Sequence, residues 1–313
     1  MDRNILRQMI RYGCLVILVV AVIGFKGIAQ RARVVALPTL KHPEVTIPNT
    51  EVRKIRSHIV DQEFTIYVQL PLSYVADSAA IYPVLYVTDA NRSFPMFANI
   101  SSVLGFPEGN FPEIIVVGIG YSITDMADWA AWRTRDLTPT NDTGTDNYWN
   151  RLLTKMTSRK FEVTSGGAPR FLEFIIKELI PFMESNYRVS STDRGLAGYS
   201  YGGLFVLYAL FTYPEAFERY FAGSPSLEYD NDIMFKYENT FAAPDKGLMA
   251  KIFFSAGSLE DSATISDVKK MADRLQSRFR PGLEVSSHVF DGEDHRSCMA
   301  AAVMRAFKVL YCQ

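Results

Sequence analysis

Six short apolar runs, separated by longer segments, are the feature that most restricts the fold of this chain. The runs are YPVLYVTD (82–89), EIIVVGIGY (113–121), RGLAGYS (194–200), YFAGSPS (220–226), KIFFSAG (251–257) and LEVSSHVFDG (283–292). Helix-like segments lie around them: FLEFIIKELIPFMESNY, GLFVLYALFTY, SDVKKMADRLQSRF and CMAAAVMRAFKVLY. Near-continuous apolar strands that alternate with helices are typical of a parallel sheet covered on both faces. The pattern predicts an α/β fold with a mostly parallel central sheet and helices on both faces.

The residues before these runs predict a different pairing. KIRSHIV and FTIYVQLP alternate between apolar and polar side chains around Asp61 and Gln62, which indicates an N-terminal antiparallel hairpin. Residues 30–50 contain three prolines and show no period, so we expect an extended lead-in there. We find no internal repeat and no second boundary, and therefore expect one domain over residues 51–313.

The N-terminus resembles an export signal. Arg3, Arg7 and Arg11 precede the apolar run CLVILVVAVIGF, and the small residues Gly27 and Ala29 follow it. This order predicts a signal peptide over residues 1–29. The alternative is an uncleaved anchor, although a helix of this run rises only about 18 Å against a hydrocarbon core of roughly 30 Å. Both interpretations place the folded part outside the cytosol, secreted or periplasmic, with membrane contact only through this segment if it is retained.

Charge and cysteine content exclude several classes of function. The formal net charge is −1, and no clustered excess of Lys and Arg indicates a nucleic-acid partner. Cys298 and Cys312 have no further Cys or His nearby at ligand spacing, so no metal site is expected. We expect no cofactor of any kind, and the sequence carries no signal for an oligomeric state.

Residues 122–167 break the alternation of strands and helices. They include DWAAWRTRDLTPTNDTGTDNYW and TSGG, are polar, and lack a long apolar period. A span this long without regular structure is usually functional. We therefore expect a loop that shapes a binding pocket.

The pentapeptide GYSYG places Ser200 between Gly198 and Gly202, after an expected strand and before an expected helix. A strand-to-helix turn this sharp needs small flanking residues and exposes the serine hydroxyl above the sheet. Gly203 would let the helix approach the sheet closely. The context predicts a nucleophile, and the alternative is a turn with an inert serine.

A nucleophilic serine needs an imidazole base and an acid that orients it, in the order Ser, acid, His for this architecture. Only His288 and His295 follow Ser200. His288 lies within a strand pattern, whereas His295 lies in the loop DGEDHRS after the last strand, so His295 is the predicted base. The loop GSLED offers Glu260 as the predicted acid, with Asp261 as the alternative. The acids directly before His295 are more typical of a helix cap.

An acyl-transfer site also needs two backbone N–H donors for the oxyanion. The first is expected from Tyr201, the residue after the nucleophile. The second is expected from the loop after YPVLYVTD, at Ala90 or Asn91.

These motifs together resemble the putative-esterase branch of the α/β-hydrolases. The branch includes enterochelin and bacillibactin esterases, feruloyl esterases, S-formylglutathione hydrolases and mycolyltransferases. YPVLYVTDAN, RTRDLTPT, GYSYGGLFVLYALFTYPEAFERYFAGSPS, GSLED and VFDGEDH carry the resemblance, which spans roughly residues 45 to 312. The nearest subgroup is siderophore esterase-like. The resemblance implies the α/β-hydrolase fold, Ser200 as nucleophile, His295 as base and Glu260 as acid.

Two features bear on the substrate that the resemblance implies. Siderophore hydrolases bind large anionic iron chelates, and Arg133 and Arg135 in RTRDLTP are the cations that stand out in the 122–167 segment. Their alternative role is an ion pair with Asp136 or neighbouring acids. The subgroup usually carries tryptophan after SPS, where this chain has Leu227 and Glu228, so the pocket wall is expected to differ.

The sequence therefore predicts a serine carboxylic-ester hydrolase that acts through an acyl-enzyme on a small-molecule ester, siderophore-type or other. One alternative is an acyltransferase with the same triad. The other is a non-catalytic envelope binding protein on a hydrolase scaffold.

Overall fold

The computed structural model describes residues 45–106, 111–123, 125–241, 248–278 and 282–312. One compact unit spans residues 47–313 and contains a single eight-stranded sheet with the order β1-β2-β4-β3-β5-β6-β7-β8. The strands are β1 (Thr50–Ser57), β2 (Gln62–Gln69), β3 (Tyr82–Val87), β4 (Ile115–Tyr121), β5 (Val189–Tyr199), β6 (Arg219–Gly223), β7 (Ala250–Gly257) and β8 (Leu283–Phe290). The predicted signal peptide (1–29) and most of the predicted lead-in (30–50) lie outside the described residues.

The pairing confirms the predicted mixture of directions. β1 and β2 form the expected antiparallel hairpin, with Ser57 opposite Gln62, and β2 also pairs antiparallel with β4. All other neighbours in the sheet are parallel. The carboxyl ends of β3, β5, β6, β7 and β8 therefore meet at one edge of the sheet, where ligand sites of such folds lie.

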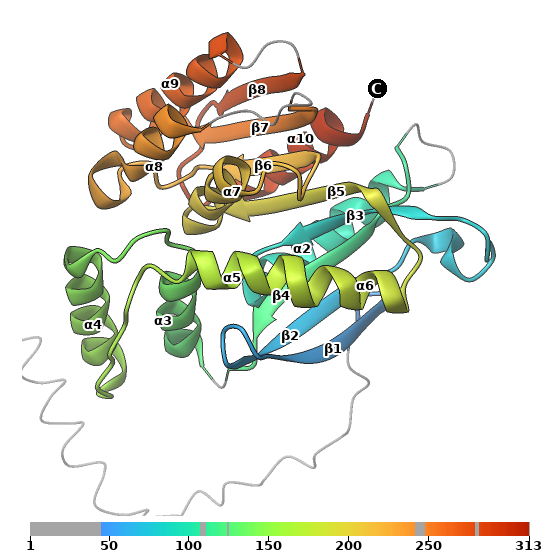
Figure 1. Cartoon of the computed structure of the whole chain (residues 1–313), viewed down its shortest axis with the longest axis horizontal. Helices are drawn as coiled ribbons and strands as arrows, with labels where there is room; N and C mark the ends of the chain where they lie inside the picture. The colour runs from blue at the N-terminus through green and yellow to red at the C-terminus, as the bar shows by residue number, and fades with distance from the viewer. Residues whose placement is uncertain (1–44, 107–110, 124, 242–247, 279–281, 313) are drawn as a thin grey trace, which may run out of the picture. The chain divides into compact units, whose positions relative to one another are not determined.

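Helices cover both faces of the sheet, as predicted (Figure 1). They are α2 (Ala90–Leu104), α3 (Met126–Asp136), α4 (Thr143–Thr157), α5 (Ala168–Phe174), α6 (Ile180–Asn186), α7 (Tyr201–Thr212), α8 (Tyr229–Thr240), α9 (Ser262–Arg278) and α10 (Cys298–Tyr311). A short 3-10 turn spans Leu72–Tyr74. One apolar core lies between the sheet and α5 to α9, and a second lies between the sheet and the pair α2 and α10. Within the described residues, no helix combines the length and apolar character needed to cross a membrane.

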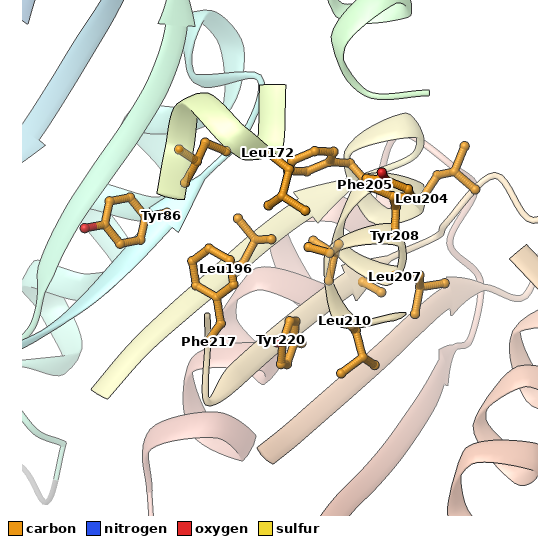
Figure 2. Packing of buried hydrophobic residues seen from close by; sticks show 14 of the residues in the cluster. Tyr86, Leu172, Leu196, Leu204, Phe205, Leu207, Tyr208, Leu210, Phe217 and Tyr220 are labelled. Carbon is orange, nitrogen blue, oxygen red and sulfur yellow. The ribbon is translucent and has the colours of Figure 1, made fainter. Parts of the chain in front are cut away.

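Helix α7 is the centre of the first core. Every residue from Gly202 to Phe211 is buried. Figure 2 shows Leu210 of this helix next to Tyr220 of β6, and Leu204, Leu207 and Leu196 of β5 belong to the same cluster. Because a helix buried on all sides cannot shift without opening the core, it fixes the position of the residue at its start.

The prediction of a structureless loop over residues 122–167 was wrong, because this segment contains α3 and α4. Each helix begins at an aspartate whose side chain accepts two backbone N–H groups, Asp125 for α3 and Asp142 for α4. Such caps start a helix without a long apolar period. Leu153 is the single buried residue of α4, which explains why hydrophobic periodicity did not reveal the helix.

The segment predicted as one helix at 171–187 is interrupted. A π-helical turn over Ile175–Leu179 separates α5 from α6. Pro181 is the second residue after this turn, has no N–H to donate, and would place its ring against the carbonyl of Lys177 in a regular α-helix. The wider turn relieves that conflict while the apolar face stays in the core.

Candidate active site

Ser200 occupies the turn between β5 and α7 with φ 60° and ψ −120°, a conformation that non-glycine residues rarely adopt. A Cβ at Gly198 would lie 2.2 Å from the carbonyl oxygen of Gly202, and one at Gly203 would lie 2.8 Å from the carbonyl oxygen of Gly223. The glycines are therefore needed for the chain to turn this sharply and for α7 to approach the sheet. The predicted strained turn is present.

The backbone and hydroxyl of Ser200 face the turn after β6. The Ser200 N–H donates to the carbonyl of Gly223 at 2.9 Å, and its Oγ lies 3.4 Å from Oγ of Ser226. The strained turn is thus tied to the neighbouring strand, which holds the hydroxyl at the carboxyl edge of the sheet.

His295 and Glu260 approach each other from two further turns at the same edge. Nδ1 of His295 lies 2.7 Å from Oε2 of Glu260. Glu260 follows β7 and its side chain is only 4% exposed, whereas His295 follows β8 and its side chain is 46% exposed. An imidazole held by a buried carboxylate on one nitrogen presents its other nitrogen for proton transfer.

The second carboxylate oxygen of Glu260, Oε1, accepts two further hydrogen bonds. Oε1 accepts the N–H of Gly257 at 2.7 Å and lies 2.8 Å from Oγ of Ser224. Burial alone would raise the pKa of Glu260, but the hydrogen bonds from His295, Gly257 and Ser224 outweigh it and hold the pKa below the ordinary 4.5. Glu260 is therefore an anion at neutral pH.

The alternative acid and base lie elsewhere. Oδ1 of Asp261 accepts the N–H of Ala263 at the start of α9 and has no bond to His295 among the described contacts. His288 lies exposed on β8 with its ring against Phe290, at a centroid distance of 4.5 Å. Asp294 accepts the N–H groups of the two residues after His295, in the turn before α10, as expected of a cap. Of the candidates, the structure pairs Glu260 with His295.

Ser200, Glu260 and His295 all line one cavity of about 860 Å³. Its wall is built from the turns at the carboxyl ends of the strands and from residues of α2, α3, α4, α7, α9 and α10. Its larger apolar side chains are Met96, Phe97, Trp129, Trp149 and Met299. A cavity of this volume fits a medium-sized organic ligand.

The two predicted substrate-binding arginines differ in position. Arg133 lines the cavity, but it is 7% exposed and donates two hydrogen bonds of 2.8 Å to Asp89. Arg135 is not among the residues that line the cavity, and its guanidinium bonds Asp136 and Gln62 instead. Both side chains thus take the alternative role of ion pairing, because each lies beside a carboxylate that burial would otherwise leave unpaired.

The predicted oxyanion donors start two helices at the cavity. Tyr201 begins α7 and lines the cavity. Ala90 begins α2 and is 2% exposed, and the side-chain amide of Asn91 is bound to the backbone of Tyr121. Neither Ala90 nor Asn91 is among the residues that line the cavity, although Asp89 directly before them is. The choice between these two donors remains a prediction.

Two arginines that the sequence analysis did not single out line the cavity. Arg92 is exposed, with its guanidinium 5.2 Å from the ring centroid of Trp129, and Arg296 is exposed directly after His295. Neither forms an ion pair with a carboxylate within the described part of the chain. Arg92 directly follows Asn91 and Arg296 directly follows His295, and these positions next to predicted site residues could have identified both arginines from the sequence.

The described residues hold no group of three or more His, Cys, Asp or Glu side chains placed to bind a metal ion. Ser200 at its strained turn shares one cavity with an imidazole that is held by a buried carboxylate. Such a set of groups can activate a hydroxyl for attack on an acyl carbon.

Comparisons with known proteins agree with this chemistry. Residues 57–159 and 156–308 match a protein family described as "Putative esterase". The ferri-bacillibactin esterase BesA of Bacillus subtilis (strain 168) is 32% identical over 272 residues, which cover 84% of this chain and 90% of that protein. The siderophore triacetylfusarinine C esterase of Aspergillus fumigatus is 26% identical over 259 residues, covering 73% of this chain and 81% of that protein. Among solved structures, the BES protein from Bacillus cereus has a TM-score of 0.73 and 26% identity, covering 87% of this chain and 99% of that one.

Proposed function

Since the chain belongs to the putative esterase family of α/β-hydrolases, we propose that it is a serine carboxylic-ester hydrolase with Ser200, His295 and Glu260 as its catalytic triad. The observation that carries this proposal is the 2.7 Å contact between His295 and Glu260 in the cavity that Ser200 also lines. A hydrolytic or acyl-transfer site uses these three groups together, and the relatives are named as esterases.

The reaction would proceed in two steps through an acyl-enzyme. Ser200 Oγ attacks the acyl carbon while His295 takes its proton, and His295 then returns that proton to the leaving alcohol. A water molecule enters and is activated by the same imidazole, which releases the acid and restores Ser200. The oxyanion formed in each step would accept the N–H of Tyr201 and that of Ala90 or Asn91. Glu260 remains ionised throughout and stabilises the imidazolium.

We infer that the substrate is an anionic ester of the siderophore type. The relatives are named for siderophore esters, and the cavity of this chain supplies suitable contacts. Arg92 and Arg296 offer positive charge, and Trp149 offers an aromatic face for a planar group. Any iron would arrive as cargo of the substrate and not as a cofactor of the enzyme.

Hydrolysis of matched esters tests this substrate class. We expect Arg92→Ala and Arg296→Ala each to raise KM for an iron-loaded catecholate trilactone by about tenfold, the equivalent of one charge-assisted interaction of about 1.4 kcal/mol. KM for a neutral p-nitrophenyl ester should stay within about twofold. Arg305→Ala, an exposed arginine on α10 outside the cavity, is the matched control. Equal KM changes for both esters, or none for either, would contradict recognition of an anion.

We also propose that the protein is exported by means of residues 1–29. The basic residues, the short apolar run and the small residues after it support this proposal. Intact mass of the protein recovered from outside the cytosol should correspond to a chain that begins near Gln30. A full-length chain in the membrane fraction would favour the anchor, and a full-length soluble chain in the cytosol would contradict export.

A further inference from the structure

Two hydroxyl groups lie in line behind the carboxylate of Glu260. Oγ of Ser224 is 2.8 Å from Oε1 of Glu260 and also 2.8 Å from the hydroxyl of Tyr199. Ser224 is 1% exposed, and Tyr199 is half-buried at the end of β5. Tyr199, Ser224 and Glu260 thus form a continuous hydrogen-bonded row that ends at His295.

The direction of the hydrogen bonds in this row follows from proton counting. An ionised carboxylate has no proton to give, so Ser224 must donate its single hydroxyl proton to Glu260. The Ser224 hydroxyl is oriented as a donor toward Tyr199 as well, but its one proton cannot serve two acceptors, and the ionised carboxylate is the stronger one. With that proton on Glu260, Ser224 has only lone pairs for Tyr199, so the phenol is the donor of that contact. Burial raises the pKa of Tyr199, which keeps the phenol protonated. The hydroxyl protons of Tyr199 and Ser224 therefore both point along the row toward the Glu260 carboxylate.

The backbone holds Ser224 in this position at some cost. Its φ of 34° is in the left-handed region, and its N–H donates to the carbonyl of Ser255 on β7 at 2.9 Å. The preceding Gly223 accepts the N–H of Ser200, and a Cβ there would lie 2.5 Å from the Tyr199 ring. Strain of this kind persists where the surrounding structure requires it, frequently at functional sites.

Tyr199 also contacts the base directly. Its ring packs against the imidazole of His295 with a centroid distance of 5.3 Å, and it immediately precedes Ser200 in the chain. The Tyr199 ring therefore contacts the base, His295. Its hydroxyl is linked to the acid, Glu260, through Ser224.

We propose that Ser224 and Tyr199 are positioning residues of the triad, which fix the Glu260 carboxylate so that Oε2 stays aimed at His295. This inference rests on the proposed function. A glutamate has one more rotatable bond than an aspartate, so its carboxylate loses more freedom on being fixed. With the Gly257 N–H alone on Oε1, the carboxylate could turn away from His295, whereas two donors define its plane.

Kinetics of single variants give the first test. We expect Ser224→Ala to lower kcat for a small neutral ester about tenfold, the effect of one hydrogen bond to a charged group, with KM unchanged. Tyr199→Phe, which keeps the ring against His295, should lower kcat about threefold because its hydroxyl acts through Ser224. The exposed pair Ser277→Ala and Tyr213→Phe removes the same groups far from the cavity and should leave kcat unchanged.

Double variants separate positioning from general damage. Tyr199→Phe should have no further effect once Ser224 is alanine, and Ser224→Ala should have none once Glu260 is alanine. In addition, we expect the Nδ1–H proton of His295, which is bound to Glu260, to resonate far downfield and to shift in Ser224→Ala and Tyr199→Phe. If Ser224→Ala does not fold, Tyr199→Phe and its combination with Glu260→Ala give the same test.

The outcomes distinguish the two proposals. If Ser200→Ala abolishes hydrolysis while Ser224→Ala and Tyr199→Phe retain full kcat, the triad stands and the positioning role is wrong. Losses that add independently in the double variants would likewise overturn it. If Ser200→Ala retains hydrolysis, the proposed function itself fails.

Discussion

The guanidinium of Arg133 donates two hydrogen bonds of 2.8 Å to the carboxylate of Asp89, and the two side chains are only 9% and 10% exposed. The pair connects α3 to the turn between β3 and α2. The guanidinium also lies 4.9 Å from the Trp129 ring centroid and 5.1 Å from that of Tyr201, the residue after the nucleophile. This ion pair therefore joins the two turns from which the oxyanion donors are expected.

Removal of Arg133 should destabilise the protein strongly. Arg133→Ala leaves the Asp89 carboxylate buried without its partner, which typically costs about 3 to 5 kcal/mol. Lys160→Ala, which breaks a pair with Glu162 that is exposed on both sides, should cost less than about 1 kcal/mol. Urea unfolding of both variants measures the difference. Equal losses in the two variants would show that Arg133 and Asp89 do not interact as the structure indicates.

The lowered pKa of Glu260 predicts a pH-dependent contribution to stability. A carboxyl group whose pKa is lowered by folding stabilises the folded state above its unfolded pKa, and this contribution is lost as pH falls through the folded pKa. Glu260→Gln should therefore lower the melting temperature most at neutral pH. The gap to the unsubstituted protein should close as pH falls below the ordinary value of 4.5. A gap that stays constant from neutral to acidic pH would mean that the carboxylate charge is not stabilised.

Two glycines should respond to alanine in opposite ways. At Gly203 the new Cβ would meet backbone atoms at 2.8 Å and 3.0 Å, so the substitution should destabilise by about 1 to 3 kcal/mol and lower activity by moving Ser200. At Gly144 in α4 the nearest atom is 3.4 Å away, and the backbone is helical. There alanine should stabilise by about 0.4 to 1 kcal/mol, because it restricts the unfolded chain. Denaturant unfolding of the two variants measures the change in the free energy of unfolding for each, which should be a decrease for Gly203→Ala and an increase for Gly144→Ala.

The strands and the triad order could be predicted from sequence because their signals are local. β3, β4 and β7 are apolar at nearly every position, and Ser200 has glycines at fixed spacing. The helices α3 and α4 were missed because aspartate caps start them and they bury few residues, so they show no long apolar period.

Contacts between distant residues could not be predicted in this way. Asp89 and Arg133 lie 44 positions apart, and Ser224 and Glu260 lie 36 apart. No local pattern marks either pair, so Arg133 was predicted as a substrate contact with an ion pair as the alternative, and Ser224 was not singled out at all. The choice of Glu260 over Asp261 depended on a resemblance, since adjacent acids in a loop differ only in where the folded chain points them.

Covalent labelling with a fluorophosphonate tests the central claim most directly. The account predicts that the protein gains one adduct and that peptide mapping places it on Ser200, not on Ser226, whose Oγ lies 3.4 Å away. It also predicts that a folded Ser200→Ala variant is neither labelled nor active on p-nitrophenyl esters. An adduct on another residue, or ester hydrolysis that survives Ser200→Ala, would contradict it.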